Sequence, residues 1–253
     1  MKKTIRFIIS ITASASVLIN HALCTQTNNC GKISDYTFTE DDCKVVVANR
    51  DAEKKLALTF DDGPSEKYTS KILDILSRNN VKATFFIIGS NAEKNPELVK
   101  RIISEGHEIG NHTYSHPQLK KISPEELNLE INKTQKIIKG ITGITPTLFR
   151  PPGGYLNNTI MEIITSNNCI PVLWSWRQDT MDWKNPPVDT VVNTVLSNVK
   201  DGDIILFHDY IYGESPTPEA LNRIIPELLN KGYNFLTVTE LINTKNQPAT
   251  QTS

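Results

Sequence analysis

The sequence has almost no net charge and few cysteines, and both facts limit the classes of protein to which it can belong. Its 253 residues carry a formal net charge of −1, so it lacks the basic excess with which proteins bind nucleic acid. Four cysteines fit an exported protein but define no disulfide framework. Cys169 begins an apolar, strand-like run and is expected to be a buried thiol. With no internal repeat or linker, the ordinary hydrophobic fraction fits one medium-sized globular domain.

The N-terminus has an apolar run, but this run is too short and too rich in Ser and Thr for a comfortable membrane span. Three basic residues precede the apolar positions 7–19, and small residues follow at Ala22 and Cys24. This pattern predicts a secretory signal peptide over residues 1–24. A lipid anchor on Cys24 is disfavoured because bulky Leu23 stands where a small residue is expected. An uncleaved N-terminal anchor is the main alternative.

We therefore expect a secreted protein, or one associated with the cell surface or cell wall, with no stable membrane span after cleavage. Residues 25–51 form an N-terminal extension in which a local bridge between Cys30 and Cys43 is plausible. The folded domain is expected over residues 52–242, followed by a flexible tail at 243–253.

From Lys55 onward, short apolar runs alternate with amphipathic helical patterns. Strands that alternate with helices pair in parallel, which predicts either a βα barrel or a doubly wound sheet. About seven units in roughly 190 residues favour the α/β class, with a distorted, incomplete (β/α) barrel of about seven parallel strands in a single domain. The expected strands are 56–60, 83–88, 108–111, 147–150, 170–176, 203–207 and 235–238. The expected helices are 69–78, 97–105, 125–138, 159–166, 189–199 and 219–229.

Helix boundaries are marked by caps. The sequence Ser-Pro-Glu-Glu at 123–126 is typical of a capping box with proline at the first helical position, and Thr-Pro-Glu at 217–219 repeats the order of cap and proline. Gly106 and Gly232 stand where helices are expected to end.

Reactive side chains follow the expected strands at one end. Taken singly, each has an ordinary structural explanation, since Asp-Asp-Gly is often a turn and two histidines four residues apart often share a helix face. Their joint occurrence at successive strand ends indicates a site, because parallel αβ folds build sites at the carboxyl ends of their strands. These residues are Asp61, Asp62, His112, Arg150, Asp179 and His208.

The segment 112–116 has the spacing of a metal site. His112 and His116 are four residues apart, and a single helical turn would bring both imidazoles onto one metal ion. A carboxylate from elsewhere would complete a His-His-Asp site with open positions for water and substrate. Because Asp61 and Asp62 are adjacent, one can bind the metal while the other takes a proton. These groups are the minimum for metal-assisted hydrolysis.

Five motifs occur in an order that resembles the polysaccharide deacetylases of carbohydrate esterase family 4, which share a NodB-like homology domain. One motif would be a weak signal, whereas five in order are a strong one. The likeness covers about residues 52–241 and implies a polysaccharide deacetylase catalytic domain over 52–242. The motifs are TFDDG at 59–63, HTYSH at 112–116, RPPGG at 150–154, DTMDW at 179–183 and LFH at 206–208.

The resemblance implies that Asp61 is the general base and His208 the general acid. It also implies that Asp62, His112 and His116 hold a divalent metal, most often Zn²⁺, with Co²⁺ and Ni²⁺ left open. The chemistry agrees, since a bound cation lowers the pKa of its water towards ~7 and so makes hydrolysis feasible at neutral pH.

Two further residues are expected to support the base and the acid. Arg150 beside Asp61 would keep that carboxylate ionised and oriented, and Asp179 beside His208 would raise the pKa of the imidazole. Asp182 is expected to close a turn.

The acetyl pocket is inferred from the resemblance as well. Trp183 and Leu206 match the positions that wall it in the family. The third motif departs from the family pattern, because Gly153 stands where an aromatic residue is usual and Tyr155 lies two residues later. The N–H of Gly153 would then be the oxyanion donor, and the sugar-stacking surface stays open.

These features predict a secreted, metal-dependent enzyme that removes acetyl groups from an N-acetylglucosamine polymer, either peptidoglycan or chitin. An acetylxylan O-acetyl esterase is the nearest alternative, since the same site can attack an ester. A non-catalytic glycan-binding protein is the alternative from another class. The expected partner is a glycan and not nucleic acid. The oligomeric state is open, with a monomer as the default.

Overall fold

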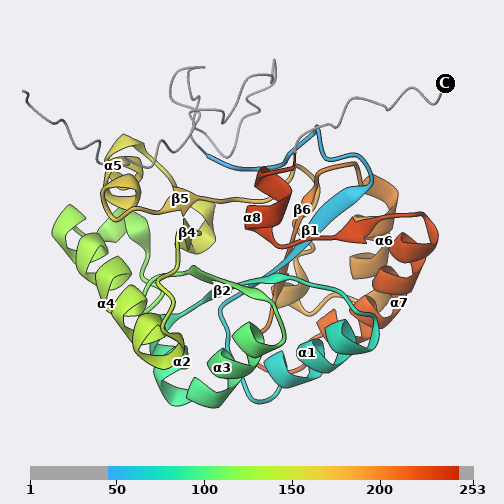
Figure 1. The fold of residues 1–253 in the computed structure, drawn as a ribbon, viewed down its shortest axis with the longest axis horizontal. Helices are drawn as coiled ribbons and strands as arrows, with labels where there is room; N and C mark the ends of the chain where they lie inside the picture. The colour runs from blue at the N-terminus through green and yellow to red at the C-terminus, as the bar shows by residue number, and fades with distance from the viewer. Residues whose placement is uncertain (1–44, 245–253) are drawn as a thin grey trace, which may run out of the picture. The chain divides into compact units, whose positions relative to one another are not determined.

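A computed structural model describes residues 45–244. In this part of the chain, seven strands form one sheet in the order β5-β4-β3-β2-β1-β6, with β7 beside β1, and all these strand pairs are parallel. The sheet curls into an incomplete barrel surrounded by helices (Figure 1), which confirms the expected fold class. The predicted signal peptide and the Cys30–Cys43 bridge lie outside the described residues, as does most of the predicted tail.

The strands agree with the expected positions and differ in length. The segment 108–111 is a strand as expected, whereas the strands expected over 170–176 and 235–238 are only two residues long. Val238 begins a helix instead, because Thr237 and Glu240 form a capping box there. The strands are β1 (Lys55–Asp61), β2 (Thr84–Ile87), β3 (Glu108–Asn111), β4 (Leu148–Phe149), β5 (Ile170–Pro171), β6 (Ile204–His208) and β7 (Asn234–Phe235).

Six of the helices lie where the sequence pattern predicts them, while α2 and α8 are short and were not expected. None of the helices within 45–244 is long and apolar enough to cross a membrane. The helices are α1 (Thr69–Arg78), α2 (Gly89–Lys94), α3 (Pro96–Ser104), α4 (Pro124–Thr142), α5 (Asn158–Ser166), α6 (Val188–Asn198), α7 (Thr217–Asn230) and α8 (Val238–Ile242). Short 3₁₀ turns are η2 (Leu119–Lys121), η3 (Pro152–Gly154) and η4 (Asp182–Lys184).

Three of the four predicted helix boundaries are confirmed. Ser123 forms a capping box at the start of α4. Gly106 and Gly232 follow helices with φ of +79° and +82°, a backbone conformation that glycine adopts without strain. The prediction that Thr217 caps a helix is wrong. This residue is the first of α7, and its hydroxyl donates to Asp182 instead.

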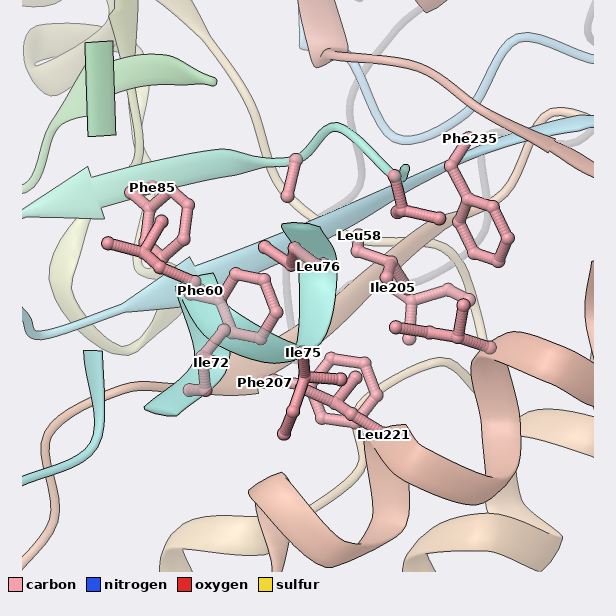
Figure 2. Close-up of a cluster of buried hydrophobic side chains, with 14 of the residues drawn as sticks. Leu58, Phe60, Ile72, Ile75, Leu76, Phe85, Ile205, Phe207, Leu221 and Phe235 are labelled. Carbon is pink, nitrogen blue, oxygen red and sulfur yellow. The ribbon is translucent and has the colours of Figure 1, made fainter. Parts of the chain in front are cut away.

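The main core lies between the outer face of the sheet and the helices. Alternate residues of a strand point to opposite faces, and Phe60 of β1 points outward. Its ring stacks on Phe85 and Phe207 of the neighbouring strands at centroid distances of 5.0 and 5.7 Å. Figure 2 shows these rings against Ile72 of α1 and Leu221 of α7. This core fixes β1, β2 and β6 side by side.

A second, smaller core fills the inner face of the curled sheet at its N-terminal end. Ala57, Phe86 and Ile204 point inward and pack with Val238 and Leu241 of α8. Because α8 occupies this end of the barrel interior, the inward-facing positions further along each strand are left for polar side chains.

A segment without regular secondary structure, residues 46–48, pairs with the chain beside β5 and β6, the two strands at the edges of the sheet. Val46 pairs with Val172 just after β5, and Ala48 pairs with Asp203 just before β6. Residues 46–48, which the sequence assigned to the N-terminal extension, therefore contact the sheet. Cys169 is 3% exposed, which confirms a buried thiol.

Candidate active site

The two adjacent aspartates come together at the end of β1. Asp61 is the last residue of the strand, is only 3% exposed, and lies opposite His208 of β6 in the strand register. Asp62 has φ +76°, and this left-handed turn brings its carboxylate back to the side on which Asp61 points. Both carboxylates therefore approach His112, whose Nε2 lies 3.8 Å from Asp61 Oδ2 and 3.4 Å from Asp62 Oδ1.

The two histidines converge on Asp62 from the loop that follows β3. His116 Nε2 also lies 3.4 Å from Asp62 Oδ1. His112 Nδ1 lies 2.7 Å from the carbonyl oxygen of Arg150, so Nδ1 carries a proton and Nε2 is the ring nitrogen that faces the carboxylates. The expected helical turn is wrong, since Thr113 and His116 have φ of +67° and +55°. A loop stabilised by tertiary contacts produces the convergence instead.

These three side chains fit a divalent metal ion. One ligand atom each from Asp62, His112 and His116 can be chosen so that all lie within 4.8 Å of one another. Among the residues described, Asp62 Oδ1 is buried and accepts no hydrogen bond. Burial raises the pKa of Asp62, but the neighbouring histidines outweigh it and the net pKa is lowered. Two imidazoles and a carboxylate are ligands that Zn²⁺ and Co²⁺ accept, and three protein ligands leave coordination open.

Arg150 lies beside Asp61, as the sequence predicts. Its guanidinium is fully buried and donates to Asp61 Oδ1 at 2.7 Å and to Thr59 Oγ1 at 2.8 Å. It also donates to the carbonyl oxygens of Val172 and Leu173 at 3.3 and 2.9 Å. Burial lowers the pKa of Arg150 in spite of the Asp61 carboxylate. Four fixed acceptors leave the guanidinium no freedom, so Asp61 is held in one orientation.

His208 pairs with Asp182, and the expectation that Asp179 stands beside it is wrong. His208 Nδ1 lies 2.7 Å from Asp182 Oδ1, and the His208 main-chain N–H donates to Asp182 Oδ2 at 2.8 Å. Asp179 instead pairs with Leu206 and accepts the N–H of Met181 at 3.0 Å. The segment runs parallel to β6, so the residue opposite His208 lies further along the chain than Asp179.

The Asp182 carboxylate controls the charge of the His208 imidazole. Burial alone would lower the pKa of His208, but the hydrogen bond and the negative charge of Asp182 outweigh it and raise the pKa to about 9. Thr217 of α7 donates its hydroxyl to the same carboxylate. The imidazole is therefore protonated at neutral pH and sits opposite Asp61.

Asp209 was not among the candidate site residues of the sequence analysis. It is fully buried, and its carboxylate accepts the N–H of Gly63 at 2.9 Å and the hydroxyl of Thr69 at 2.6 Å. A Cβ on Gly63 would lie 2.0 Å from Asp209 Oδ2, so glycine is required there. Burial raises the pKa of Asp209 to about 7. Its place directly after the fifth motif is the signal that could have found it.

The residues predicted for the acetyl pocket have mixed surroundings. Leu206 is 3% exposed and shares the inner face of β6 with the imidazole two residues later. Trp183 is half exposed in η4, and Gly153 is exposed with φ +63°. Tyr155 turns its ring towards Lys120, whose Nζ lies 4.8 Å from the ring centroid.

The chain is similar to known proteins in sequence and in fold. The sequence pattern of the family described as polysaccharide deacetylase matches residues 48–169. A peptidoglycan-N-acetylglucosamine deacetylase from Bacillus cereus is 46% identical over 193 residues, which covers 76% of this chain and 90% of that protein.

Two solved structures are also similar. A peptidoglycan N-acetylglucosamine deacetylase in complex with a substituted N-oxidanyl-benzamide has a TM-score of 0.76 and 42% identity, covering 81% of this chain and 95% of the other. A family 4 acetyl xylan esterase from Clostridium thermocellum, in complex with cobalt, has a TM-score of 0.70 and 37% identity, covering 77% and 93%. The chain belongs to the polysaccharide deacetylases of carbohydrate esterase family 4.

Proposed function

We propose that this protein is a metal-dependent deacetylase that removes N-acetyl groups from an N-acetylglucosamine polymer, with peptidoglycan as the first candidate. One observation carries the proposal. Three ligand atoms, an oriented carboxylate and a protonated imidazole meet at the carboxyl ends of β1, β3 and β6. Amide hydrolysis needs these components together, namely an activated water, a base and an acid.

Asp62, His112 and His116 would hold the metal ion. When bound, a divalent cation acts as a Lewis acid and lowers the pKa of a coordinated water towards ~7. Zn²⁺ is the first choice, with Co²⁺ and Ni²⁺ as alternatives.

Asp61 is the proposed general base. Its Oδ1 is occupied by Arg150 at 2.7 Å, whereas its Oδ2 faces His112 at 3.8 Å. Oδ2 is therefore the oxygen that takes a proton from the attacking water. The water oxygen forms a new bond to the acetyl carbonyl carbon, and the carbonyl oxygen gains negative charge. The N–H of Gly153 is the proposed donor to that oxygen, an effect worth ~3–4 kcal/mol for a well-placed group.

His208 is the proposed general acid. The bond between the carbonyl carbon and the sugar nitrogen breaks, and the nitrogen takes a proton from His208 Nε2. Asp182 holds the opposite ring nitrogen, Nδ1, at 2.7 Å. It thereby fixes which nitrogen faces the substrate and favours the charged ring before transfer. The products are acetate and a glycan with a new amino group.

The acyl group is chosen by a small apolar space. Leu206 lies on the same face of β6 as His208, and Trp183 follows Asp182 directly. We infer that these two side chains wall the methyl group of the acetyl, and a tight pocket would disfavour a longer acyl chain by ~1–3 kcal/mol.

The substrate follows from the relatives and the leaving group. The Bacillus cereus relative is a peptidoglycan deacetylase, which favours a cell-wall glycan and a place outside the cell. The Clostridium thermocellum relative is an acetyl xylan esterase, and it makes ester cleavage the second candidate. An amine leaves less readily than an alkoxide, so the strongly paired His208 favours amide hydrolysis.

The test is acetate release from peptidoglycan, chitooligosaccharides and acetylxylan in parallel, with Zn²⁺ and with chelator. Asp61→Asn is the negative control, and Asp189→Asn, an exposed aspartate on α6, is the matched control. We expect release that requires the metal and Asp61, with peptidoglycan as the best substrate. No release from any substrate by protein that binds zinc would refute the deacetylase function and bring the glycan-binding alternative forward.

A further inference from the structure

The loop that contributes two of the three metal ligands has an unfavourable backbone. We call residues 112–116 the ligand loop. Thr113 has φ +67° and His116 has φ +55°, and residues with a Cβ seldom adopt this left-handed conformation. Such a conformation persists only where the surroundings determine it. The groups that hold the ligand loop therefore decide whether its histidines are ready for a metal.

Helix α2 holds the carbonyl groups of the ligand loop. The N–H of Gly89 donates to the Thr113 carbonyl oxygen at 2.9 Å, and the N–H of Ser90 donates to the Tyr114 carbonyl oxygen at 3.0 Å. These are main-chain groups, so no side chain of α2 is needed for this half of the support.

Glu130 of α4 holds the N–H groups. One oxygen, Oε2, accepts the N–H of Tyr114 and the N–H of Ser115, both at 2.7 Å, while Oε1 accepts the Ser115 hydroxyl at 2.9 Å. Two successive N–H groups that converge on one oxygen form an anion-binding nest. Hydrogen bonds to a charged acceptor are about twice as strong as neutral ones.

The next residue of α4 supports the beginning of the ligand loop. The Ile131 carbonyl oxygen accepts the side-chain N–H of Asn111 at 2.9 Å, and Asn111 Oδ1 in turn accepts the N–H of Thr113 at 2.9 Å. The capping box at Ser123 fixes the start of the same helix. Two neighbouring residues of a capped helix thus hold the ligand loop at its start and at its centre.

We propose that Glu130 is a positioning residue that sets the geometry of the two histidine ligands through its hydrogen bonds to the ligand loop. The inference rests on the proposed metal site. Glu130 is not a ligand and lies outside the five motifs, and it acts through the backbone of Tyr114 and Ser115. Without its carboxylate, the strained backbone can relax and the imidazoles separate.

The test compares zinc affinity among variants of the metal-free protein, measured by calorimetric titration against a chelator of known affinity. Glu130→Ala removes the acceptor, while Glu130→Gln removes the charge and keeps an oxygen in place. Glu93→Ala is the matched control, because the Glu93 carboxylate contacts only the side chain of the loop, the Tyr114 hydroxyl, at 2.8 Å. The melting temperature of each metal-free variant reports its folding, and the visible spectrum with Co²⁺ reports ligand geometry.

We expect Glu130→Ala to bind zinc ~10–100-fold more weakly, Glu130→Gln to lose clearly less because it keeps an acceptor oxygen, and Glu93→Ala to stay within about threefold of the wild type. The Co²⁺ spectrum should change in Glu130→Ala alone. If Glu130→Ala proves unstable, Glu130→Met, which keeps the apolar part of the side chain, makes the same comparison.

Three results would overturn the role of Glu130. Affinity within threefold of wild type in Glu130→Ala would show that the loop does not need the carboxylate. A loss of zinc affinity in Glu130→Gln or Glu93→Ala equal to that in Glu130→Ala would mean that negative charge near the site, and not the positioning of the loop, determines the affinity. A wild-type protein that binds no zinc would refute the metal site itself and this role with it, whereas equal affinities in all variants leave the proposed function intact.

Discussion

Two buried ion pairs lie at the carboxyl ends of the strands, which we call the rim of the sheet. They differ in which partner is held in place by further hydrogen bonds. In the first pair, Arg150 is fixed by three acceptors besides Asp61, so the cation is the support and the carboxylate is left to react. In the second, Asp182 accepts hydrogen bonds from the backbone N–H of His208 and from Thr217, so the anion is the support and the imidazole is left to react. The same kind of pair thus provides a base or an acid, according to which partner the fold immobilises.

Replacing the reactive partner of the first pair should have the largest effect. Asp61→Asn keeps an oxygen for Arg150 but cannot take a proton, so we expect kcat to fall by ~10²–10⁴-fold. Zinc affinity should stay near the wild-type value, because Asp61 is not a proposed ligand. Acetate release and zinc titration measure the two quantities separately. If the Asp61→Asn variant retained a tenth of the activity, another group would have to take the proton.

Replacing the anchored partner of the first pair should mainly lower stability. Arg150→Leu leaves the Asp61 carboxylate buried without its counter-charge, and loss of one partner of a buried pair costs about 3–5 kcal/mol. The matched control is Arg223→Leu, whose pair with Asp189 is exposed on both sides and should contribute about 0–1 kcal/mol. Urea unfolding gives both values. Equal losses in the two variants would mean that burial of Arg150 adds nothing to its pair.

Replacing the anchored partner of the second pair should change the pH dependence. The pKa of His208 is raised from its ordinary value of 6.5 to about 9, so the stability from the pair is complete below 6.5 and is lost as pH rises through about 9. The general acid is lost over the same range. In Asp182→Asn, activity should begin to fall at lower pH, with kcat at pH 8 reduced by roughly 10–100-fold.

A pH–rate profile with a closely spaced alkaline series measures this shift. Asp179→Asn is the control, since Asp179 lies in the same motif and does not contact His208. An alkaline limb that moves in Asp179→Asn and not in Asp182→Asn would return the supporting role to Asp179.

The fold and the position of the rim could be predicted from sequence because both depend on local patterns. Helix α1 has a regular hydrophobic periodicity, and the structure places it at the expected residues, as it does strand β3. The carboxyl ends of parallel strands meet at one edge, so motifs that follow successive strands meet as well.

Local patterns do not settle which groups pair within the rim. Asp179 and Asp182 share one motif, and only the register of an irregular segment beside β6 decides which reaches His208. The ligand loop has a helix-compatible spacing, yet it is not helical: Thr113 and His116 have a left-handed backbone, and contacts from α2 and Glu130 hold the loop in place. These are contacts between residues far apart in sequence, which no spacing rule contains.

Thr217 offers the smallest and most selective change to the second pair. Its hydroxyl donates to Asp182 Oδ2 and is fully buried, so Thr217→Val removes one hydrogen bond at nearly constant volume. We expect a loss of about 1–2 kcal/mol in the free energy of unfolding. Because His208 still donates to both oxygens of Asp182, the alkaline limb should move by less than in Asp182→Asn. Equal shifts in the two variants would mean that the hydroxyl, rather than the imidazole, orients the carboxylate, and the anchor of the acid would then lie in α7.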